Sequence, residues 1–152
     1  MKTRITTLSL GLLFTAAYAA PLLSSQLRLT PSEVDSLPAH EGGAGTSGVG
    51  GIRTTVMSGD PTQDGSYTIR VSVPANTKIQ PHTHRDDRTA VVISGVWYFG
   101  YGPVAGAAAE KVLPAGSFYT EPGGVAHFAE TKADPVVIYI TGHGPTDTVF
   151  VK

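Results

Sequence analysis

The chain has 152 residues, which is enough for one domain but short for two, and its formal net charge at pH 7 is −1. This balance, with no run of basic residues, argues against nucleic acid and against a membrane surface as partners. Cysteine is absent. Disulfides, thiolate nucleophiles and iron–sulfur clusters are therefore excluded, and a metal site must use nitrogen and oxygen ligands.

The first residues have the pattern of a secretory signal peptide. Met1-Lys2-Thr3-Arg4 is basic, residues 8–17 are apolar but too few to span a bilayer, and Ala17-Tyr18-Ala19 is a small-x-small cleavage site. A buried N-terminal helix is the alternative interpretation. The pattern predicts a signal peptide over residues 1–19, cleaved near Ala19, and a periplasmic or secreted mature protein.

Residues 20–51 are expected to form an N-terminal extension. Thr30, Pro31 and Glu33 predict a short helix near residues 31–35, as N-cap, first helical residue and capping-box acid. Six glycines then lie between residues 42 and 51. A phosphate-binding loop would need a strand before it and a helix after it, and neither is visible, so a flexible linker is favoured. His40 is expected to be a solvated loop residue.

From residue 52 onward the sequence predicts a β domain that extends to residue 152. Residues 66–73 alternate, and residues 89–99 are rich in β-branched and aromatic side chains, with Gly95 at a bend. Further strands are expected within residues 112–119, 127–131, 136–141 and 148–151, and a loop over residues 100–106. Because no long amphipathic helical period follows residue 40, these short strands indicate an all-β antiparallel sandwich or barrel.

Two separate motifs carry three histidines. His82 and His84 lie in Pro81-His82-Thr83-His84, and His127 ends the pattern Gly-x5-Pro-x-Gly-x2-His that starts at Gly116. On a strand, residues two apart point to the same face. Arg88 keeps that parity if the strand is not bulged. Three imidazoles bind zinc, copper, iron, nickel or manganese and leave coordination positions open, which predicts a reactive metal site.

Together, the two motifs resemble those of the cupin family, Gly-x5-His-x-His-x3,4-Glu-x6-Gly and Gly-x5-Pro-x-Gly-x2-His-x3-Asn. The matching positions are His82, His84, Gly95, Gly116, Pro122, Gly124 and His127, whereas Asn76 stands at the first glycine and Thr131 at the final asparagine. Over residues 55–141 the chain resembles a small single-domain bacterial cupin. The resemblance implies a double-stranded β-helix, or jelly-roll barrel, one divalent transition-metal ion and a homodimer.

The chain departs from this pattern at the metal-binding glutamate, where it has Arg88. A guanidinium has no lone pair for a cation. The site is therefore expected to use three histidines, or to recruit Asp86 or Asp87 through a local bulge. Arg88 either attracts an anionic ligand to the metal or forms an ion pair with Asp86 or Asp87 at the rim. Cupins without the glutamate, including the thiol dioxygenase type, are similar in this respect.

The other polar side chains near the motifs are less informative. The hydroxyl groups of Tyr98, Tyr101 and Tyr119 are all candidates to reach the site, and Tyr119, with Arg88, is predicted to be catalytic. Glu121 is expected at the rim and His143 at the surface. The aromatic residues after Gly95 and around the second motif are expected to be core residues more often than substrate contacts.

Three functions fit these motifs. The favoured one is an oxidoreductase of the oxidase or dioxygenase type, acting on a small or carbohydrate-derived substrate. Copper is its preferred metal, and iron, manganese or zinc are possible. The second is a Lewis-acid isomerase, lyase or hydrolase, with Asp86, Asp87, Glu121 and Tyr119 as candidate bases. The third is a metal-binding or ligand-binding module without turnover. An exposed strand over residues 52–58 is expected to pair two subunits.

Overall fold

A computed structural model of the chain describes residues 26–152. The predicted signal peptide, residues 1–19, lies outside the described residues, and so does the start of the predicted extension. Within residues 26–152, no helix has the length and apolar character needed to cross a membrane.

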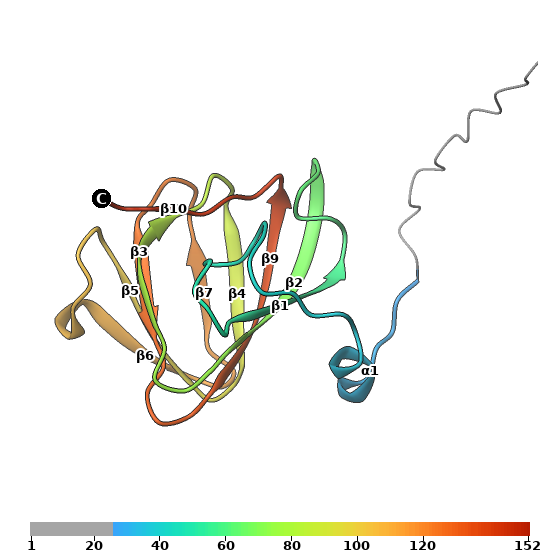
Figure 1. The fold of residues 1–152 in the computed structure, drawn as a ribbon, viewed down its shortest axis with the longest axis horizontal. Coiled ribbons are helices and arrows are strands. Elements are labelled where there is room, and N and C mark those ends of the chain that lie inside the picture. The colour runs from blue at the N-terminus through green and yellow to red at the C-terminus, as the bar shows by residue number, and fades with distance from the viewer. Residues whose placement is uncertain (1–25) are drawn as a thin grey trace, which may run out of the picture.

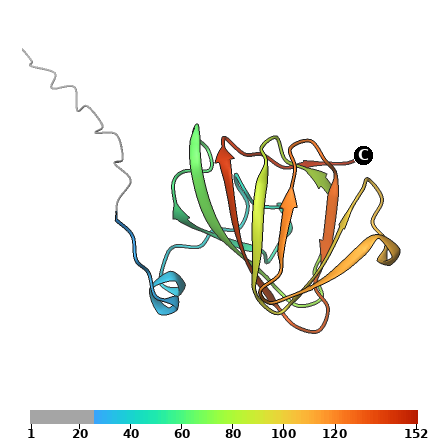
Figure 2. The ribbon, with the colours of Figure 1, turned by 180° about the vertical axis from the view of Figure 1, so that it is seen from behind.

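Two five-stranded antiparallel sheets form the body of the molecule (Figure 1). The first sheet has the order β1 (Arg53–Ser58), β2 (Gly65–Val73), β9 (Val136–Gly144), β4 (Arg88–Ser94) and β7 (Phe118–Glu121). The second has the order β10 (Val149–Phe150), β3 (Lys78–Thr83), β8 (His127–Glu130), β5 (Val96–Tyr101) and β6 (Glu110–Pro114). Figure 2 shows the same two layers from behind. The predicted all-β jelly-roll architecture is confirmed.

The hydrophobic core lies between the sheets because successive side chains of a strand point to opposite faces. Strand β2 buries the alternating residues predicted from the sequence, which are Tyr67, Ile69, Val71 and Val73. The facing side chains include Trp97 and Phe99 from β5. Burying one large apolar side chain stabilises the fold by about 1.5–3 kcal/mol, so these strands supply much of the driving force for folding.

The same alternation carries polar side chains into the interior at one end of the fold. The inward face of β4 begins with Arg88, and the inward face of β7 ends with Glu121. Since β4 and β7 are antiparallel neighbours with Arg88 directly opposite Glu121, the two side chains meet at the same end. This end also holds the histidines described below.

The segment before β1 is more closely attached to the barrel than a flexible linker would be. Helix α1 (Pro31–Asp35) forms where predicted, and the backbone N–H of Thr30 donates to the Glu33 carboxylate at 2.7 Å. In the glycine-rich stretch, Thr46 is only 4% exposed, and its carbonyl accepts a hydrogen bond from the Thr148 hydroxyl at 2.6 Å. Residues 26–51 therefore contribute contacts to the β domain.

Two differences from the predicted elements have simple packing causes. Strand β5 continues through Gly100 and Tyr101, where a loop was expected, because both residues pair with β8. A side chain at Gly100 would lie 2.5 Å from the Phe128 ring, so glycine leaves room for that ring. A short 3-10 helix, η1 (Ala107–Ala109), then leads directly into β6.

The glycine positions of the two histidine motifs mark unusual backbone conformations. Gly95 joins β4 to β5 with a φ of +78°, and a Cβ there would lie 2.3 Å from the Pro135 carbonyl oxygen. Asn76, which replaces the first glycine of the pattern, has a φ of +57°. Asparagine tolerates this left-handed region better than most residues, so the substitution preserves the turn that leads into β3.

Candidate metal centre

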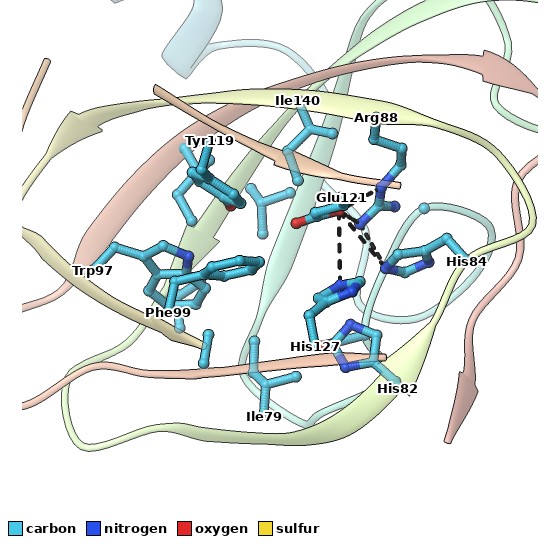
Figure 3. Close-up of a pocket in the computed structure, with 16 residues that line it drawn as sticks. Ile79, His82, His84, Arg88, Trp97, Phe99, Tyr119, Glu121, His127 and Ile140 are labelled. Carbon is cyan, nitrogen blue, oxygen red and sulfur yellow. Dashed lines mark hydrogen bonds and ion pairs between the residues drawn. The ribbon is translucent and has the colours of Figure 1, made fainter. Parts of the chain in front are cut away.

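The three histidines of the two motifs converge in the interior (Figure 3). His82 lies on β3, directly paired with His127 on β8, and His84 follows the end of β3. One ligand atom from each residue lies within 4.8 Å of the others, and the three side chains are 2–5% exposed. The residues predicted to be ligands are thus brought together, although His84 lies just outside the strand that was expected to carry it.

The orientation of each imidazole is fixed by a backbone carbonyl. The Nδ1 atoms of His82, His84 and His127 lie 2.5–3.1 Å from the carbonyl oxygens of, in that order, Gln80, Asp147 and Val125. Because a carbonyl only accepts hydrogen bonds, each Nδ1 carries the proton and each Nε2 keeps a lone pair. His127 Nε2 is buried with no hydrogen-bond partner. This donor set fits a divalent transition metal.

The burial of these imidazoles keeps them neutral. Desolvation lowers the pKa of His82 to about 4 and that of His84 to about 3, and it lowers the pKa of His127 as well. A neutral imidazole is the form that coordinates a metal ion. At neutral pH the three side chains are therefore ready to act as ligands.

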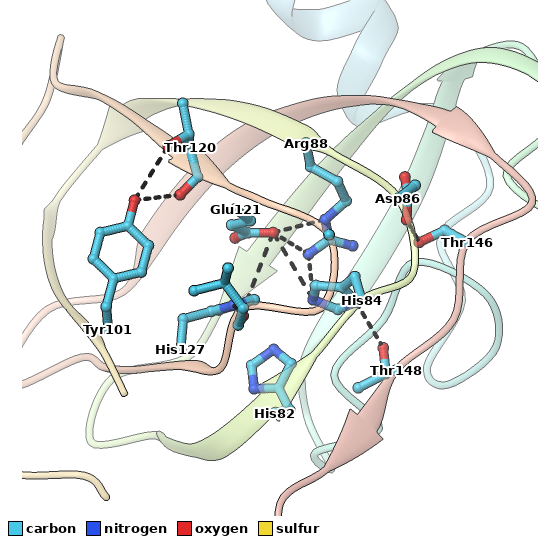
Figure 4. A network of polar contacts seen from close by, with 12 residues as sticks. His82, His84, Asp86, Arg88, Tyr101, Thr120, Glu121, His127, Thr146 and Thr148 are labelled. Carbon is cyan, nitrogen blue, oxygen red and sulfur yellow. Dashed lines mark hydrogen bonds and ion pairs between the residues drawn. The ribbon is translucent and has the colours of Figure 1, made fainter. Parts of the chain in front are cut away.

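A buried ion pair lies beside the histidines (Figure 4). Arg88 Nε donates to Glu121 Oε2 at 2.6 Å, and Arg88 Nη2 contacts the same oxygen. Both residues are 4% exposed. The expectation that Glu121 lies at the rim was wrong, because the alternation of β7 turns Tyr119 and Glu121 inward together. Arg88 pairs with Glu121 and not with Asp86 or Asp87.

The ion pair contacts the proposed ligand atoms directly. Arg88 Nη2 lies 2.6 Å from His84 Nε2, and Glu121 Oε2 lies 3.8 Å from His84 Nε2 and 3.9 Å from His127 Nε2. Arg88 was expected to face the site because it would continue the strand of His82 and His84. This reason was wrong, since β3 and β4 belong to different sheets. Arg88 faces the site because it begins the inward face of β4.

Mutual attraction keeps both members of the pair charged. Burial alone would raise the pKa of Glu121, but the charge and hydrogen bond of Arg88, together with His127 and His84, outweigh burial and lower the pKa to about 2. Burial alone would lower the pKa of Arg88, and the Glu121 carboxylate raises it. Glu121 is therefore an ionised carboxylate and a weak base near neutral pH.

Neither of the two aspartates considered as a fourth ligand points to the histidines. Asp86 accepts hydrogen bonds from the hydroxyls of Tyr67 at 2.7 Å and Thr146 at 2.5 Å. Asp87 is exposed and accepts from the Gly123 backbone N–H at 2.8 Å. Within residues 26–152, the cluster of potential metal ligands consists of the three histidines alone. The carboxylate that approaches it is Glu121.

Of the three tyrosines considered, Tyr119 faces the site. Its side chain is buried. Desolvation, and to a smaller extent the Glu121 charge, raises the pKa of Tyr119 well above 10, so the hydroxyl keeps its proton. The Tyr101 hydroxyl donates to the Thr120 carbonyl at 2.6 Å, and half-buried Tyr98 lies under the Lys132 ammonium group. The catalytic roles of Arg88 and Tyr119 stay predictions.

A small cavity of about 40 Å³ adjoins the histidines (Figure 3). Its wall beyond the polar residues is apolar and includes Val71, Val73, Ile79, Trp97, Phe99 and Ile138. This volume holds a few water-sized groups. A larger substrate can place only a small end inside it.

Comparisons with known proteins agree with this fold. The model of the ChrR cupin-like domain matches residues 45–147. The chain is similar to a sugar phosphate isomerase of the cupin superfamily from Silicibacter pomeroyi, with a TM-score of 0.58 and 15% identity over 74% of each chain. It is also similar to an RmlC-like cupin from Shewanella frigidimarina, with a TM-score of 0.56 and 17% identity, covering 72% of this chain and 85% of that one.

A third similar structure is the DMSP lyase DddQ from Ruegeria pomeroyi, with a TM-score of 0.53 and 18% identity over 61% of this chain. The chain spans about half the length of the DMSP lyases it matches, 47% of each. No curated protein matches the sequence. At these identities the solved structures show a shared fold alone.

Proposed function

Because the chain belongs to the ChrR cupin-like domain family, we propose that it is an enzyme dependent on one divalent metal ion, held by His82, His84 and His127. One observation carries the proposal. Each imidazole donates its Nδ1–H to a backbone carbonyl, which leaves Nε2 as the atom that can bind a metal, and one ligand atom of each imidazole lies within 4.8 Å of the others. Such carbonyl partners are typical of metal-binding histidines and fix the tautomer.

A bound ion supplies Lewis acidity and, if it is redox-active, a site for electron transfer. The protein residues have separate parts in such a reaction. Tyr119, which keeps its proton, is placed to donate a hydrogen bond to a substrate oxygen. Arg88 attracts negative charge at the same site. The apolar wall excludes water, which strengthens both interactions.

The first candidate reaction is the oxidation of a small or carbohydrate-derived substrate with oxygen or peroxide. Three neutral imidazoles leave the charge of the ion uncompensated and several coordination positions open. The cavity of about 40 Å³ suits a ligand of a few atoms. Copper is the favoured metal for nitrogen ligands, and iron, manganese or zinc are alternatives.

The second candidate reaction is non-redox chemistry of the lyase or isomerase type. It is favoured by the pairing of a protonated phenol, Tyr119, with the fixed cation Arg88, since both stabilise negative charge that develops on a substrate oxygen. Among the four candidate bases, Asp86 and Asp87 point elsewhere. The names of two similar folds, a sugar phosphate isomerase and a DMSP lyase, belong to this class of reaction.

The first experiment is the metal content, by mass spectrometry, of the full chain exported to a bacterial periplasm. One equivalent is expected in the wild type and in His143→Ala, an exposed histidine that serves as the matched control. His82→Ala and His127→Ala are expected to lose it. A wild type without metal after reconstitution contradicts the proposal.

The identity of the metal then directs the activity assay. Copper or iron leads to oxygen-consumption measurements, with Tyr119→Phe expected to lower turnover by roughly 100-fold while the metal content is unchanged. Zinc or manganese leads to assays of non-redox turnover. Metal binding with a ligand-dependent rise in Tm, and no turnover, identifies a binding module.

Export and dimerisation are further parts of the proposal. The signal-like pattern over residues 1–19 supports export, and a secreted or periplasmic location is tested by N-terminal sequencing of the mature chain, expected to start near Ala20. Strand β1 is an edge strand of its sheet, though His40 forms a bridge to Thr54 along it. Light scattering is expected to give the mass of a homodimer.

A further inference from the structure

At the position where the motif has a carboxylate, this chain has the cation Arg88, and the carboxylate Glu121 lies beside it. Arg88 stands at the position where the motif pattern has a carboxylate, on β4. Glu121 lies directly opposite it on β7, in the register that pairs these two strands. The carboxylate is thus missing from its place in the sequence pattern, while a carboxylate is present next to that place in the fold.

The Glu121 oxygen lies slightly beyond the spacing expected between ligands of one metal ion. Glu121 Oε2 is 3.8 Å from His84 Nε2 and 3.9 Å from His127 Nε2. Nitrogen and oxygen ligands lie about 2.0–2.2 Å from a zinc ion, so neighbouring ligand atoms are roughly 3–3.5 Å apart. A shift of a few tenths of an ångström brings Oε2 to that spacing from both histidines.

The Glu121 carboxylate approaches the histidine cluster from a direction that differs from that of His82. Figure 4 draws Glu121 and His82 on opposite sides of His127. The carboxylate therefore approaches the cluster from the side of Arg88, opposite His82 (Figure 4). An oxygen at that place adds a fourth ligand direction to the three nitrogen atoms.

A purely structural ion pair does not account for this placement. A buried pair contributes little net stability, because desolvating both charges offsets their attraction. This pair also contacts a nitrogen atom proposed to bind the metal. Arg88 Nη2 lies 2.6 Å from His84 Nε2, whose lone pair a metal ion would need. Arg88 Nε holds the carboxylate independently of that contact, at 2.6 Å.

We propose that Glu121 is the oxygen ligand of the metal ion, and that Arg88 is a positioning residue that holds the carboxylate through Nε and gives up His84 Nε2 when the ion binds. The inference rests on the proposed function, that the three histidines hold a metal. The ligand carboxylate has moved from β4 to the neighbouring strand β7, and a cation has taken its former place.

Cobalt(II) binding to the full chain tests the proposal, because the visible absorption of cobalt depends on its ligands. Glu121→Gln keeps the shape of the side chain and removes the charge. The matched control is Glu130→Gln, which changes an ion-paired glutamate on β8 that contacts Lys78 and Lys132. Chelator competition gives the affinity of each protein for cobalt.

Glu121→Gln is expected to weaken cobalt binding by at least about 100-fold and to change its visible spectrum, whereas Glu130→Gln behaves as the wild type. The wild-type spectrum in Glu121→Gln, at any affinity, overturns the inference, since a merely structural or electrostatic role leaves the ligand set intact. A wild type that binds no cobalt removes the metal site itself, which is a different failure.

A second measurement needs no variant and decides the matter if Glu121→Gln does not fold. The infrared difference spectrum of the wild type, with and without cobalt, reports on carboxylate coordination. We expect the carboxylate stretching bands to shift when cobalt binds. Bands that do not move overturn the assignment of Glu121 as a ligand.

Discussion

His84 and Arg88 are four residues apart in sequence, and Arg88 Nη2 lies 2.6 Å from His84 Nε2 in the interior. His84 directly follows β3 of one sheet, and Arg88 begins β4 of the other. The chain crosses from one layer to the other within residues 84–87, and Asp86 anchors the crossing through Tyr67 and Thr146. As a result, the guanidinium and the proposed metal ion would compete for the same imidazole lone pair.

Replacing Arg88 with methionine is expected to separate the stability of the metal-free protein from that of the metal-bound protein. Without Arg88 the buried Glu121 carboxylate has no partner, and the loss of one member of a buried pair costs about 3–5 kcal/mol. Metal restores a cationic partner to the carboxylate. Calorimetry is expected to show a lower Tm for metal-free Arg88→Met and a larger metal-induced rise in Tm than in the wild type. Equal rises in both proteins contradict the prediction.

The metal-free protein is expected to lose stability as the pH falls below about 6.5. His82 and His84 have folded-state pKa values of about 4 and about 3, below the ordinary value of 6.5. Between pH 3 and 6.5 the unfolded chain therefore binds more protons than the folded chain. As the pH decreases, the free energy of unfolding decreases by at most about 1.4 kcal/mol per pH unit for each histidine.

The pKa of Glu121 is lowered from 4.5 to about 2, so its contribution is present above pH 4.5 and is lost as the pH falls toward 2, in the same direction. Urea unfolding at pH 7.5, 6.5 and 5.5 isolates the histidine effect. His82→Asn is expected to show a shallower dependence on pH across this range than the wild type. A free energy of unfolding that is flat between pH 7.5 and 5.5 argues against neutral, buried histidines.

Substituting Asp86 with asparagine is expected to lower stability without removing the metal. The Asp86 carboxylate accepts hydrogen bonds from the hydroxyls of Tyr67 and Thr146. Burial of Tyr67, with a smaller contribution from Asp86, raises the pKa of Tyr67 to about 12. An amide group accepts at only one of its two positions, so the loss is about 1–3 kcal/mol. Thermal unfolding checks the loss of stability, and metal analysis checks that the metal content is unchanged. Loss of the metal at unchanged stability would instead point to Asp86 as a ligand.

Exchanging the two charges returns a carboxylate to the position that the motif pattern assigns to it. Arg88→Glu alone places two carboxylates in one buried site and is expected to be strongly destabilised. The double variant Arg88→Glu/Glu121→Arg restores the ion pair across β4 and β7. Its loss of unfolding free energy is expected to be smaller than the sum of the losses in the two single variants, by a coupling energy of about 0.5–3 kcal/mol in a double-mutant cycle. Strict additivity would show that the two side chains do not interact.

The sequence was sufficient to predict most of the strands and the three clustered histidines. The alternation of residues 66–73 identified one core strand, and the spacing of the two motifs identified His82, His84 and His127. Even the departure at Asn76 is explained by its φ of +57°. These features depend on local periodicity and on backbone conformation, which neighbouring residues determine.

Glu121 could not be placed from local pattern alone. The Pro-Gly-Gly turn that follows it indicated a surface position, whereas its partner is 33 residues earlier on a strand in the same sheet. The parity of β7, with Tyr119 also facing inward, was the available signal. Likewise, the glycine-rich stretch has no apolar periodicity, so the burial of Thr46 depends on a distant contact with Thr148.

The carbonyl that orients His84 belongs to Asp147, 63 residues further along the chain. A chain still emerging from the ribosome contains all three imidazoles before this carbonyl is available. Until then His84 lacks the partner that fixes its tautomer, and the ion would meet an incomplete set of donors. The proposed metal uptake is therefore expected to be a late event, after the last residues have folded back onto the barrel.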